Sequence, residues 1–499
     1  MSLNLPTALA SAFFLSLLWY IATSITTYHR LRHIPGPWLA SFSYLWLILT
    51  TFRNHTRESF LSLVKYGALV RVGPNYLVTS DPEILRKIQS ARSTYVRDPW
   101  YASVKLHPHQ DSLFNILDND AHDILKTKTM SGYSGRENGD PEVVVDSQII
   151  RLLTLIRRKY LSTDDKLLSA DFGALSRYFT LDVITRLAFG EPFGHLDDGT
   201  DVYGWIEHID RILTVAGLAG DIPLIRNMVF SKWGTRLFGP KPTDKRGVGR
   251  VTGVVQATVR QRFEQGAKPQ NDGLGGFMRN GLTPLECEAE TMLQIGAGSD
   301  TSATAIRGML MYLMTTPRAY IRLKSEIKHA VEQNQVSSPI TFEQAQKLPY
   351  LQASPLPFYL IPSHLNHGHY KRAPPEGDTI NGIFIPGGTA IGHNTLAITR
   401  NEAIFGQDVE VFRPERFLEC SGEKRKEMER ALDILWGGGR WTCAGRNVAL
   451  MELNKVIFEL MRVFDFQLVD IRKPWEEFIL TITMHKNMWI RITEADKLD

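Results

Sequence analysis

Cysteine is scarce in this sequence, and its scarcity excludes one class of protein. Three cysteines, Cys287, Cys420 and Cys443, occur among 499 residues. Three residues spread so widely form no disulfide framework, and they fit a reducing compartment. Strong charge is lacking too: the net charge of +4 gives no argument for a nucleic-acid partner. With 43% hydrophobic and 22% charged residues, the composition is that of a globular protein with a large core.

The beginning of the chain lacks charged side chains. None occurs in the 23 residues from Leu3 to Ile25, and a helix of about 20 residues spans a bilayer. A basic stretch at 28–33 follows, so the positive-inside rule predicts a single span with the remaining chain in the cytoplasm. We therefore expect a membrane anchor with its basic flank at 1–33 and one domain at 34–499. A cleaved signal peptide is the alternative. A signal peptide has a basic residue before its apolar stretch, and none is present here.

A glycine-rich stretch near the C-terminus, WGGGRWTCAG at 436–445, is the most distinctive part of the sequence. Three consecutive glycines suit a tight loop and not a packed helix or strand. Apolar residues at three- and four-residue spacing then predict a helix from about Gly445. Free N–H groups at such a helix start stabilise a thiolate at Cys443, which would be a soft metal ligand. A buried structural cysteine is the alternative, and a nucleotide loop is disfavoured because no accompanying nucleotide-binding motif is present.

This stretch resembles the haem-binding loop of the cytochrome P-450 superfamily, and the chain as a whole is similar to fungal microsomal members of the pisatin demethylase type. The resemblance implies a mostly helical α+β fold with small sheets. It also implies haem b as cofactor, Cys443 as the axial ligand to its iron, and Gly439 and Gly445 in the loop against it. The family usually has arginine two residues before the cysteine. That position is Trp441 here, so Arg440 is expected to pair with a haem propionate.

A helix predicted over residues 118–130 provides two further candidate haem contacts. His122 and Lys126 are four residues apart and share one face of this helix. In the family, a His-x-x-x-Arg or related pair at this place binds the haem propionates, and the resemblance implies that role for His122 and Lys126. A solvated polar face is the alternative interpretation.

A long helix is predicted from Pro284 to about Thr315, opened by a capping box. Its middle reads GAGSDTS, and two glycines inside a helix cost about 1 kcal/mol each relative to alanine. Glycine here, at Gly298, would let a flat cofactor and O2 lie against the backbone. The stretch resembles the family's AGxDT motif, which implies that Asp300 and Thr301 deliver protons. A kinked core helix with a satisfied polar cluster is the alternative.

Acidic residues are absent where the family has one. No Asp or Glu occurs between residues 350 and 375, and Pro357 and Leu360 occupy the positions of the family's Glu-x-x-Arg pair. Several prolines exclude a helix interior there. We therefore expect Arg416, in the family-like PERF segment, to lack its usual carboxylate partner. The segment 354–373 is either a misassigned coding stretch or a divergent loop, in which case Arg416 is paired elsewhere.

Taken together, the resemblance implies a haem-thiolate monooxygenase. Electrons would come from NADPH through a cytochrome reductase, with cytochrome b5 as a further donor. One oxygen atom would enter a small hydrophobic substrate, in fungal secondary metabolism or detoxification. The expected location is the endoplasmic reticulum membrane, with lipid as a partner and nucleic acid as none. Two alternatives remain: a haem-thiolate isomerase or dehydratase that uses no O2, and a catalytically impaired chain.

Overall fold

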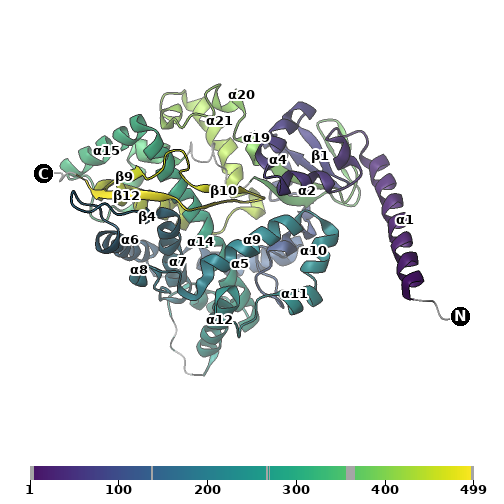
Figure 1. Cartoon of the computed structure of the whole chain (residues 1–499), viewed down its shortest axis with the longest axis horizontal. Helices are drawn as coiled ribbons and strands as arrows, with labels where there is room; N and C mark the ends of the chain where they lie inside the picture. Colours follow the sequence, from purple (N-terminus) through teal and green to yellow (C-terminus); the bar gives the residue numbers. More distant parts are fainter. Residues whose placement is uncertain (1–4, 136–138, 266–267, 269, 356–365, 496–499) are drawn as a thin grey trace.

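The computed structural model describes residues 5–135, 139–265, 268, 270–355 and 366–495, and helices make up most of it (Figure 1). The helices of its first half are Leu5–Leu31 (α1), Leu45–Phe52 (α2), Thr56–Leu61 (α3), Pro82–Gln89 (α4), Asn119–Ser134 (α5), Pro141–Lys159 (α6), Phe172–Phe189 (α7), His195–Asp198 (α8), Trp205–Gly220 (α9), Pro223–Val229 (α10), Lys232–Phe238 (α11) and Gly247–Phe263 (α12). The later helices are Gly273–Arg279 (α13), Pro284–Thr315 (α14), Pro317–Glu332 (α15), Phe342–Gln346 (α16), Pro349–Ala353 (α17), Thr395–Ile398 (α19), Glu402–Phe405 (α20), Gly422–Asp433 (α21) and Arg446–Val463 (α22).

The strands are short and gather in small sheets. They are Leu69–Gly73 (β1), Tyr76–Thr79 (β2), Val96–Arg97 (β3), Ala170–Asp171 (β4), His367–Arg372 (β5), Asp378–Ile380 (β6), Ile383–Ile385 (β7), Ala390–Asn394 (β8), Phe464–Leu468 (β9), Glu476–Ile479 (β10), Thr483–Lys486 (β11) and Trp489–Glu494 (β12). The largest sheet has five strands in the order β1-β2-β8-β5-β3, so it joins the beginning of the chain to its last third. Only β2 and β8 run parallel in it; the other described pairs are antiparallel.

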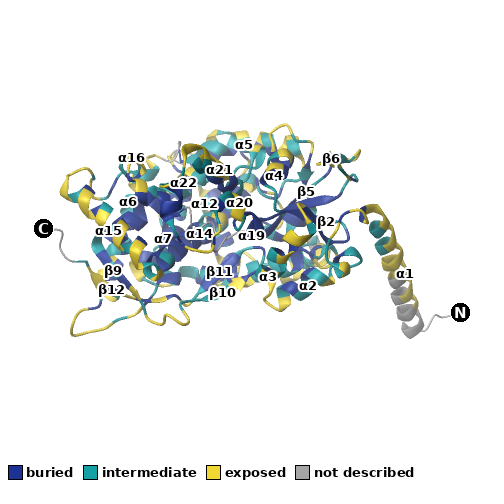
Figure 2. Ribbon diagram, turned by 90° about the horizontal axis from the view of Figure 1, so that it is seen from above, coloured by how far each residue is buried: buried dark blue, intermediate teal, exposed yellow. Residues whose placement is uncertain are grey.

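Helix α14 lies at the centre of the helical part, where it packs along α7 and against α12 and α22. Figure 2 shows α7 and α14 largely buried, as expected for helices that are apolar on most faces. The main core cluster joins their side chains to those of α6, α15 and α22, with members such as Phe179, Ile306 and Val456 fully enclosed. The mostly helical α+β fold predicted from the sequence is confirmed.

The predicted long helix is also confirmed with its start. Thr283 Oγ1 accepts a hydrogen bond from the Glu286 amide, and the Glu286 side chain accepts one from the Thr283 amide, so both halves of the capping box form. The predicted helix over 118–130 is α5, which continues to Ser134. The helix predicted from about Gly445 is α22, with Gly445 as its N-cap.

Helix α1 extends away from the body of the protein (Figure 1). Its C-terminal residue Leu31 is fully buried in a hydrophobic cluster that includes Ile34. Most of the described side chains toward the N-terminus of the helix are exposed. Serines and threonines interrupt its apolar residues. Within the described part of the chain, no helix reaches the combined length and apolar character needed for a membrane span. The anchor at 1–33 and the boundary at residue 34 stay predictions.

Arg416 pairs with a carboxylate other than the family's usual one, as the divergent-loop alternative expects. Arg416 Nη1 donates to Asp408 Oδ1 at 2.6 Å, and Nη2 donates to the Asp408 carbonyl at 2.6 Å. The neighbouring Glu415 is buried and accepts a hydrogen bond of 3.0 Å from the Tyr350 hydroxyl. The loop before Arg416 folds back and places the Asp408 carboxylate beside the guanidinium group. Linear spacing along the chain does not reveal such a contact. The predicted positions Pro357 and Leu360 lie outside the described residues.

Candidate active site

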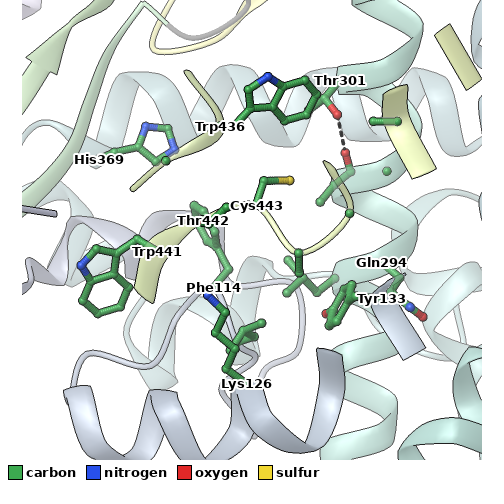
Figure 3. A pocket seen from close by; sticks show the side chains of 18 of the residues that line it. Phe114, Lys126, Tyr133, Gln294, Thr301, His369, Trp436, Trp441, Thr442 and Cys443 are labelled. Atoms are coloured by element: carbon green, nitrogen blue, oxygen red, sulfur yellow. Dashed lines mark hydrogen bonds between the residues drawn. The ribbon is translucent and has the colours of Figure 1, made fainter. Parts of the chain in front are cut away.

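A cavity of about 320 Å³ lies between α14, the loop before α22, α5 and β5 (Figure 3). This volume is in the range of small-molecule and cofactor sites, about 300–1,000 Å³. Residues far apart in the sequence line it, because the central helix and the five-stranded sheet meet there. Its apolar wall includes Leu113, Phe114, Ile184, Leu187, Leu293 and Ala297, and its polar wall includes Arg97, Tyr101, His122, Lys126, Thr301, His369, Lys371, His393, Arg440, Thr442 and Cys443.

The glycine-rich loop presents Cys443 to this cavity. The Cys443 amide donates to the Trp436 carbonyl at 2.7 Å, which closes the loop. Gly439 has a φ of +55°, and a Cβ there would lie 2.4 Å from the Gln89 carbonyl oxygen. Glycine is therefore needed at this position for the backbone conformation and for the close approach to α4. Gly439 packs against α4 and does not line the cavity, whereas Gly445 lines it.

The sulfur of Cys443 faces the open cavity (Figure 3). Enclosure by the protein raises the pKa of the Cys443 thiol, and hydrogen bonds from the Gly445 and Arg446 amides oppose that rise. The helix-start amides thus act in the predicted direction, but the protein around the cavity outweighs them, although Cys443 itself is exposed to that cavity. A cationic metal at the sulfur would supply the remaining stabilisation of the thiolate.

Four lysines and arginines, together with one histidine that burial keeps neutral, form what we call the cationic rim of the cavity: Arg97, Lys126, Lys371, Arg440 and His122. They come from β3, α5, β5 and the turn before Cys443. The Trp441 indole lies among them: its ring centre is 4.4 Å from Arg97 Cζ and 4.9 Å from Lys371 Nζ. Trp441, in the place of the family's arginine, therefore packs against one basic side chain from β3 and one from β5.

The cationic rim holds more positive charge than the nearby described acids neutralise. Arg440 and His122 both approach Asp123, at 3.5 Å and 3.0 Å. Arg97 donates to the carbonyls of Leu113 and Ile116, and Lys371 donates to Tyr101 Oη and, at 3.3 Å, to the His369 carbonyl.

Burial lowers the pKa values of several side chains in the cationic rim. Burial lowers the pKa of Lys371 well below its ordinary value and that of Arg97 to about 10. Burial and the charge of Arg97 lower the pKa of His122 to about 4. Within the described chain, Arg97 Nε, Arg440 Nε and Trp441 Nε1 are buried without a hydrogen-bond partner. The donor set therefore fits a ligand that carries two carboxylates, as haem does.

Sequence reasoning found three members of the rim and missed two. His122 and Lys126 share a helix face, and Arg440 adjoins the cysteine loop, so local spacing reveals them. Arg97 and Lys371 pair across β3 and β5, Arg97 opposite Lys371 in the register. That juxtaposition depends on strands more than 270 residues apart, and no local pattern marks it.

Helix α14 forms the wall that faces Cys443. Thr301 lines the cavity and its hydroxyl donates to the Ala297 carbonyl at 2.9 Å (Figure 3). Gly298 lines the cavity as well, but its missing Cβ faces α7: a Cβ there would lie 2.9 Å from Ile184 Cδ1. The equivalent position on Gly296 would lie 2.5 Å from Leu106 Cδ1. Both contacts involve the tips of flexible side chains, so a small shift of Ile184 or Leu106 would relieve them and packing alone does not require glycine here.

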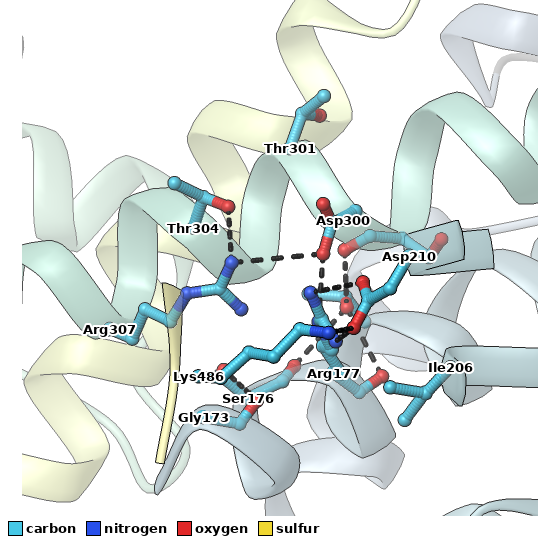
Figure 4. Close-up of polar contacts among 12 residues, drawn as sticks. Gly173, Ser176, Arg177, Ile206, Asp210, Asp300, Thr301, Thr304, Arg307 and Lys486 are labelled. Atoms are coloured by element: carbon cyan, nitrogen blue, oxygen red, sulfur yellow. Dashed lines mark hydrogen bonds and ion pairs between the residues drawn. The ribbon is translucent and has the colours of Figure 1, made fainter. Parts of the chain in front are cut away.

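Asp300 lies on the other side of α14 and is absent from the cavity lining. Its Oδ1 accepts from Arg177 Nε at 2.8 Å and lies 3.7 Å from Arg307 Nη2 (Figure 4). Arg177 also holds Asp210 through both terminal nitrogens, at 2.8 Å and 3.0 Å. Burial acts to raise the pKa of Asp300, but the two guanidinium groups outweigh it and lower that pKa below its ordinary value.

Comparisons with known proteins agree with this geometry. The sequence matches the family described as Cytochrome P-450 over residues 35–489. It is 44% identical over 485 residues to cytochrome P-450 monooxygenase ABA1 of Pyricularia oryzae, which covers 95% of each chain. It is 44% identical to monooxygenase aba1 of Botryotinia fuckeliana (93% and 92% covered) and 30% identical to pisatin demethylase of Fusarium vanettenii (92% and 90% covered). The chain belongs to the cytochrome P-450 family, whose members bind haem through a cysteine thiolate.

Proposed function

We propose that this monooxygenase inserts one oxygen atom into a small hydrophobic substrate, in fungal secondary metabolism or detoxification. For each substrate RH, O2, two electrons and two protons give ROH and water. The observation that carries the proposal is that the Cys443 sulfur and the Thr301 hydroxyl face one largely apolar cavity (Figure 3). Haem bound there supplies the activation of O2. The chain supplies the cysteine ligand, the pocket and the protons.

Each site residue has a proposed task in this scheme. The cationic rim binds the propionates, which orients the cofactor and neutralises its charge. The apolar wall binds the substrate and excludes water. Thr301 holds a proton at the cavity wall, where its Oγ1 is fixed by the Ala297 carbonyl. Asp300, next to it in the helix, passes protons toward Thr301 from the opposite side of α14.

The proposed electron source is NADPH through a cytochrome reductase, with cytochrome b5 as a further donor. Helix α21 supports this partner, because its sequence GEKRKEMERALD is densely charged and most of its charged residues are exposed. Charged surfaces of this kind speed the encounter between redox proteins.

We also propose that the protein is held at the endoplasmic reticulum membrane by α1, with its catalytic part in the cytoplasm. A second surface supports this location. Five large apolar side chains on α10 and α11 are between 66% and 83% exposed, and we call them the apolar patch: Leu224, Met228, Trp233, Leu237 and Phe238. Exposed apolar surface with a tryptophan suits the boundary between lipid headgroups and acyl chains.

Reconstitution of the purified protein with a reductase tests the proposed function. We expect the reduced carbon monoxide complex to show the absorption of thiolate-ligated haem, and the Cys443→Ala variant to lose it while the Cys420→Ala control keeps it. Comparison of metabolites with and without the gene then identifies the substrate. Its conversion without NADPH and O2 would establish the isomerase alternative, and absence of the spectrum would establish the impaired chain.

A further inference from the structure

A carboxyl group is buried behind the apolar wall of the cavity. Glu290 on α14 is fully buried and does not itself line the cavity. Its Oε1 accepts a hydrogen bond of 2.6 Å from the Leu113 amide, and its Oε2 accepts one of 2.5 Å from the Tyr133 hydroxyl. Burial raises the pKa of Glu290 to about 7, and these two donors oppose that rise. A buried carboxyl is costly, and the two hydrogen bonds offset part of this cost.

The Leu113 amide belongs to a turn at 112–116, in the connection between β3 and α5. This turn is part of neither a helix nor a strand, so its position depends on contacts with its neighbours. Arg97 of the cationic rim donates to the Leu113 carbonyl, and Glu290 accepts from the amide of the same residue. The turn is therefore fixed between the cationic rim and α14.

The turn and Tyr133 both contribute to the wall of the cavity. Leu113, Phe114 and Tyr133 line it, and Figure 3 shows Phe114 and Tyr133 among the side chains around it. The Phe114 ring packs against the Tyr101 ring, with centres 5.0 Å apart. Glu290 thus bonds, from outside the cavity, to two segments whose side chains face its interior.

We infer that Glu290 is a positioning residue for substrate selection, because it fixes the turn and Tyr133 so that the apolar wall is formed before a substrate enters. This inference rests on the proposed function, since it assigns the wall to substrate binding. A preformed wall binds a ligand that fits it without the cost of ordering the protein, and it discriminates against other shapes. Loss of the carboxyl would leave the buried Leu113 amide without its acceptor, and the turn would have to shift.

Two ligands of different size test this role in the haem-loaded protein. Imidazole and 4-phenylimidazole both bind haem iron through a nitrogen and shift its absorption, but only the larger one extends to the surrounding wall. We expect Glu290→Leu to weaken 4-phenylimidazole binding about tenfold and imidazole binding less than about twofold, because the wall must then become ordered on binding. Glu290→Gln keeps a carbonyl acceptor for Leu113, so both affinities should stay within about twofold of the wild-type values.

Glu326→Leu is the matched control. Glu326 on α15 also accepts hydrogen bonds from backbone amides, those of Tyr350 and Leu351 at 2.8 Å, but it is not part of the cavity lining. Its loss should lower the unfolding temperature without changing the ratio of the two dissociation constants. In a Phe114→Ala background, Glu290→Leu should change this ratio by no more than about twofold, because the ring through which the carboxyl acts is gone.

Hydrogen exchange gives a second readout. The backbone amides of residues 112–116 should exchange about tenfold faster in Glu290→Leu than in the wild-type protein or Glu290→Gln. If Glu290→Leu does not bind haem, Glu290→Asp, which withdraws the carboxyl by one methylene, should weaken 4-phenylimidazole binding about threefold.

An unchanged ratio of dissociation constants in the variant that binds haem would overturn the role of Glu290. An equal change in Glu290→Leu and Glu290→Gln would overturn it too, because the acceptor for Leu113 would then not be the cause. A wild-type protein that binds both imidazoles but consumes no NADPH would instead refute the proposed function, and the titrations would still decide whether Glu290 positions the wall.

Discussion

Arg177 Nε lies 2.8 Å from Asp300 Oδ1, and both side chains are buried between α7 and α14. Arg177 binds Asp210 at the same time, so its charge stays paired if Asp300 turns away. Asp210 in turn is bound by Lys486. This arrangement holds Asp300 firmly as a carboxylate, because two guanidinium groups, those of Arg177 and Arg307, face it inside the core.

Removal of the Asp300 charge should weaken the fold in a pH-dependent way. The folded-state pKa of Asp300 is lowered, so its stabilising effect is present above the unfolded pKa of about 3.9 and is lost as pH falls through the folded pKa. We expect Asp300→Asn to lower the unfolding free energy by about 3 kcal/mol at neutral pH. Denaturant unfolding should show this difference shrinking below about pH 4. A difference independent of pH would contradict the ion-pair explanation.

Substitution of Thr301 should separate haem binding from productive turnover. Thr301→Ala removes the hydroxyl at the cavity wall without touching Cys443 or the cationic rim. We expect normal haem content and about 10²-fold less product per NADPH consumed, because one positioned polar group is lost. Thr301→Ser, which keeps the hydroxyl, is the matched control. Unchanged coupling in Thr301→Ala would remove the residue from the proposed mechanism.

Lys371 offers a test of the cationic rim. It is fully buried and donates to Tyr101 Oη, and no described carboxylate pairs with it. We expect Lys371→Gln to lose haem about tenfold faster to an acceptor such as apomyoglobin, because a charged hydrogen bond to a propionate contributes about 1.5–3 kcal/mol. Lys371→Arg should retain haem, and Lys87→Gln on the surface should have no effect. Equal haem loss in all three would exclude Lys371 from the site.

Membrane attachment should depend on two surfaces. Deletion of residues 1–33 should abolish firm pelleting with membranes, because the long uncharged stretch is gone. Residual binding to vesicles should then disappear when Trp233 and Phe238 of the apolar patch are both changed to serine. Vesicle flotation of the shortened protein, with and without these changes, measures this. Firm retention of the shortened, doubly substituted protein would show a different attachment surface.

The coding sequence of residues 354–373 can be tested directly. Sequencing the transcript across residues 352–376 decides between a misassigned coding stretch and a divergent loop. Strand β5 favours a genuine sequence over 367–372, because it pairs in the five-stranded sheet and Lys371 lines the cavity. The pairing of Arg416 with Asp408 also favours a divergent loop, because it gives this arginine a carboxylate without the family's glutamate. A transcript encoding these residues, together with a normal carbon monoxide spectrum, would show that the Glu-x-x-Arg helix is dispensable here.

The sequence by itself determined the elements whose signals are local. Glycine and cysteine at 436–445 mark a loop before a helix, the capping box marks the start of α14, and four-residue spacing places His122 and Lys126 on one face. These signals depend only on backbone conformation and helix periodicity, which neighbouring residues control.

Only the tertiary structure decided which charged groups meet. It joined Arg97 to Lys371 across β3 and β5, placed Asp300 away from the cavity beside Arg177, and gave Arg416 its partner Asp408. Charged side chains buried in one core must find partners there, and many pairings satisfy the same composition. Packing of the sheet against α14 selects one pairing, and this pairing cannot be predicted from the spacing of residues along the chain.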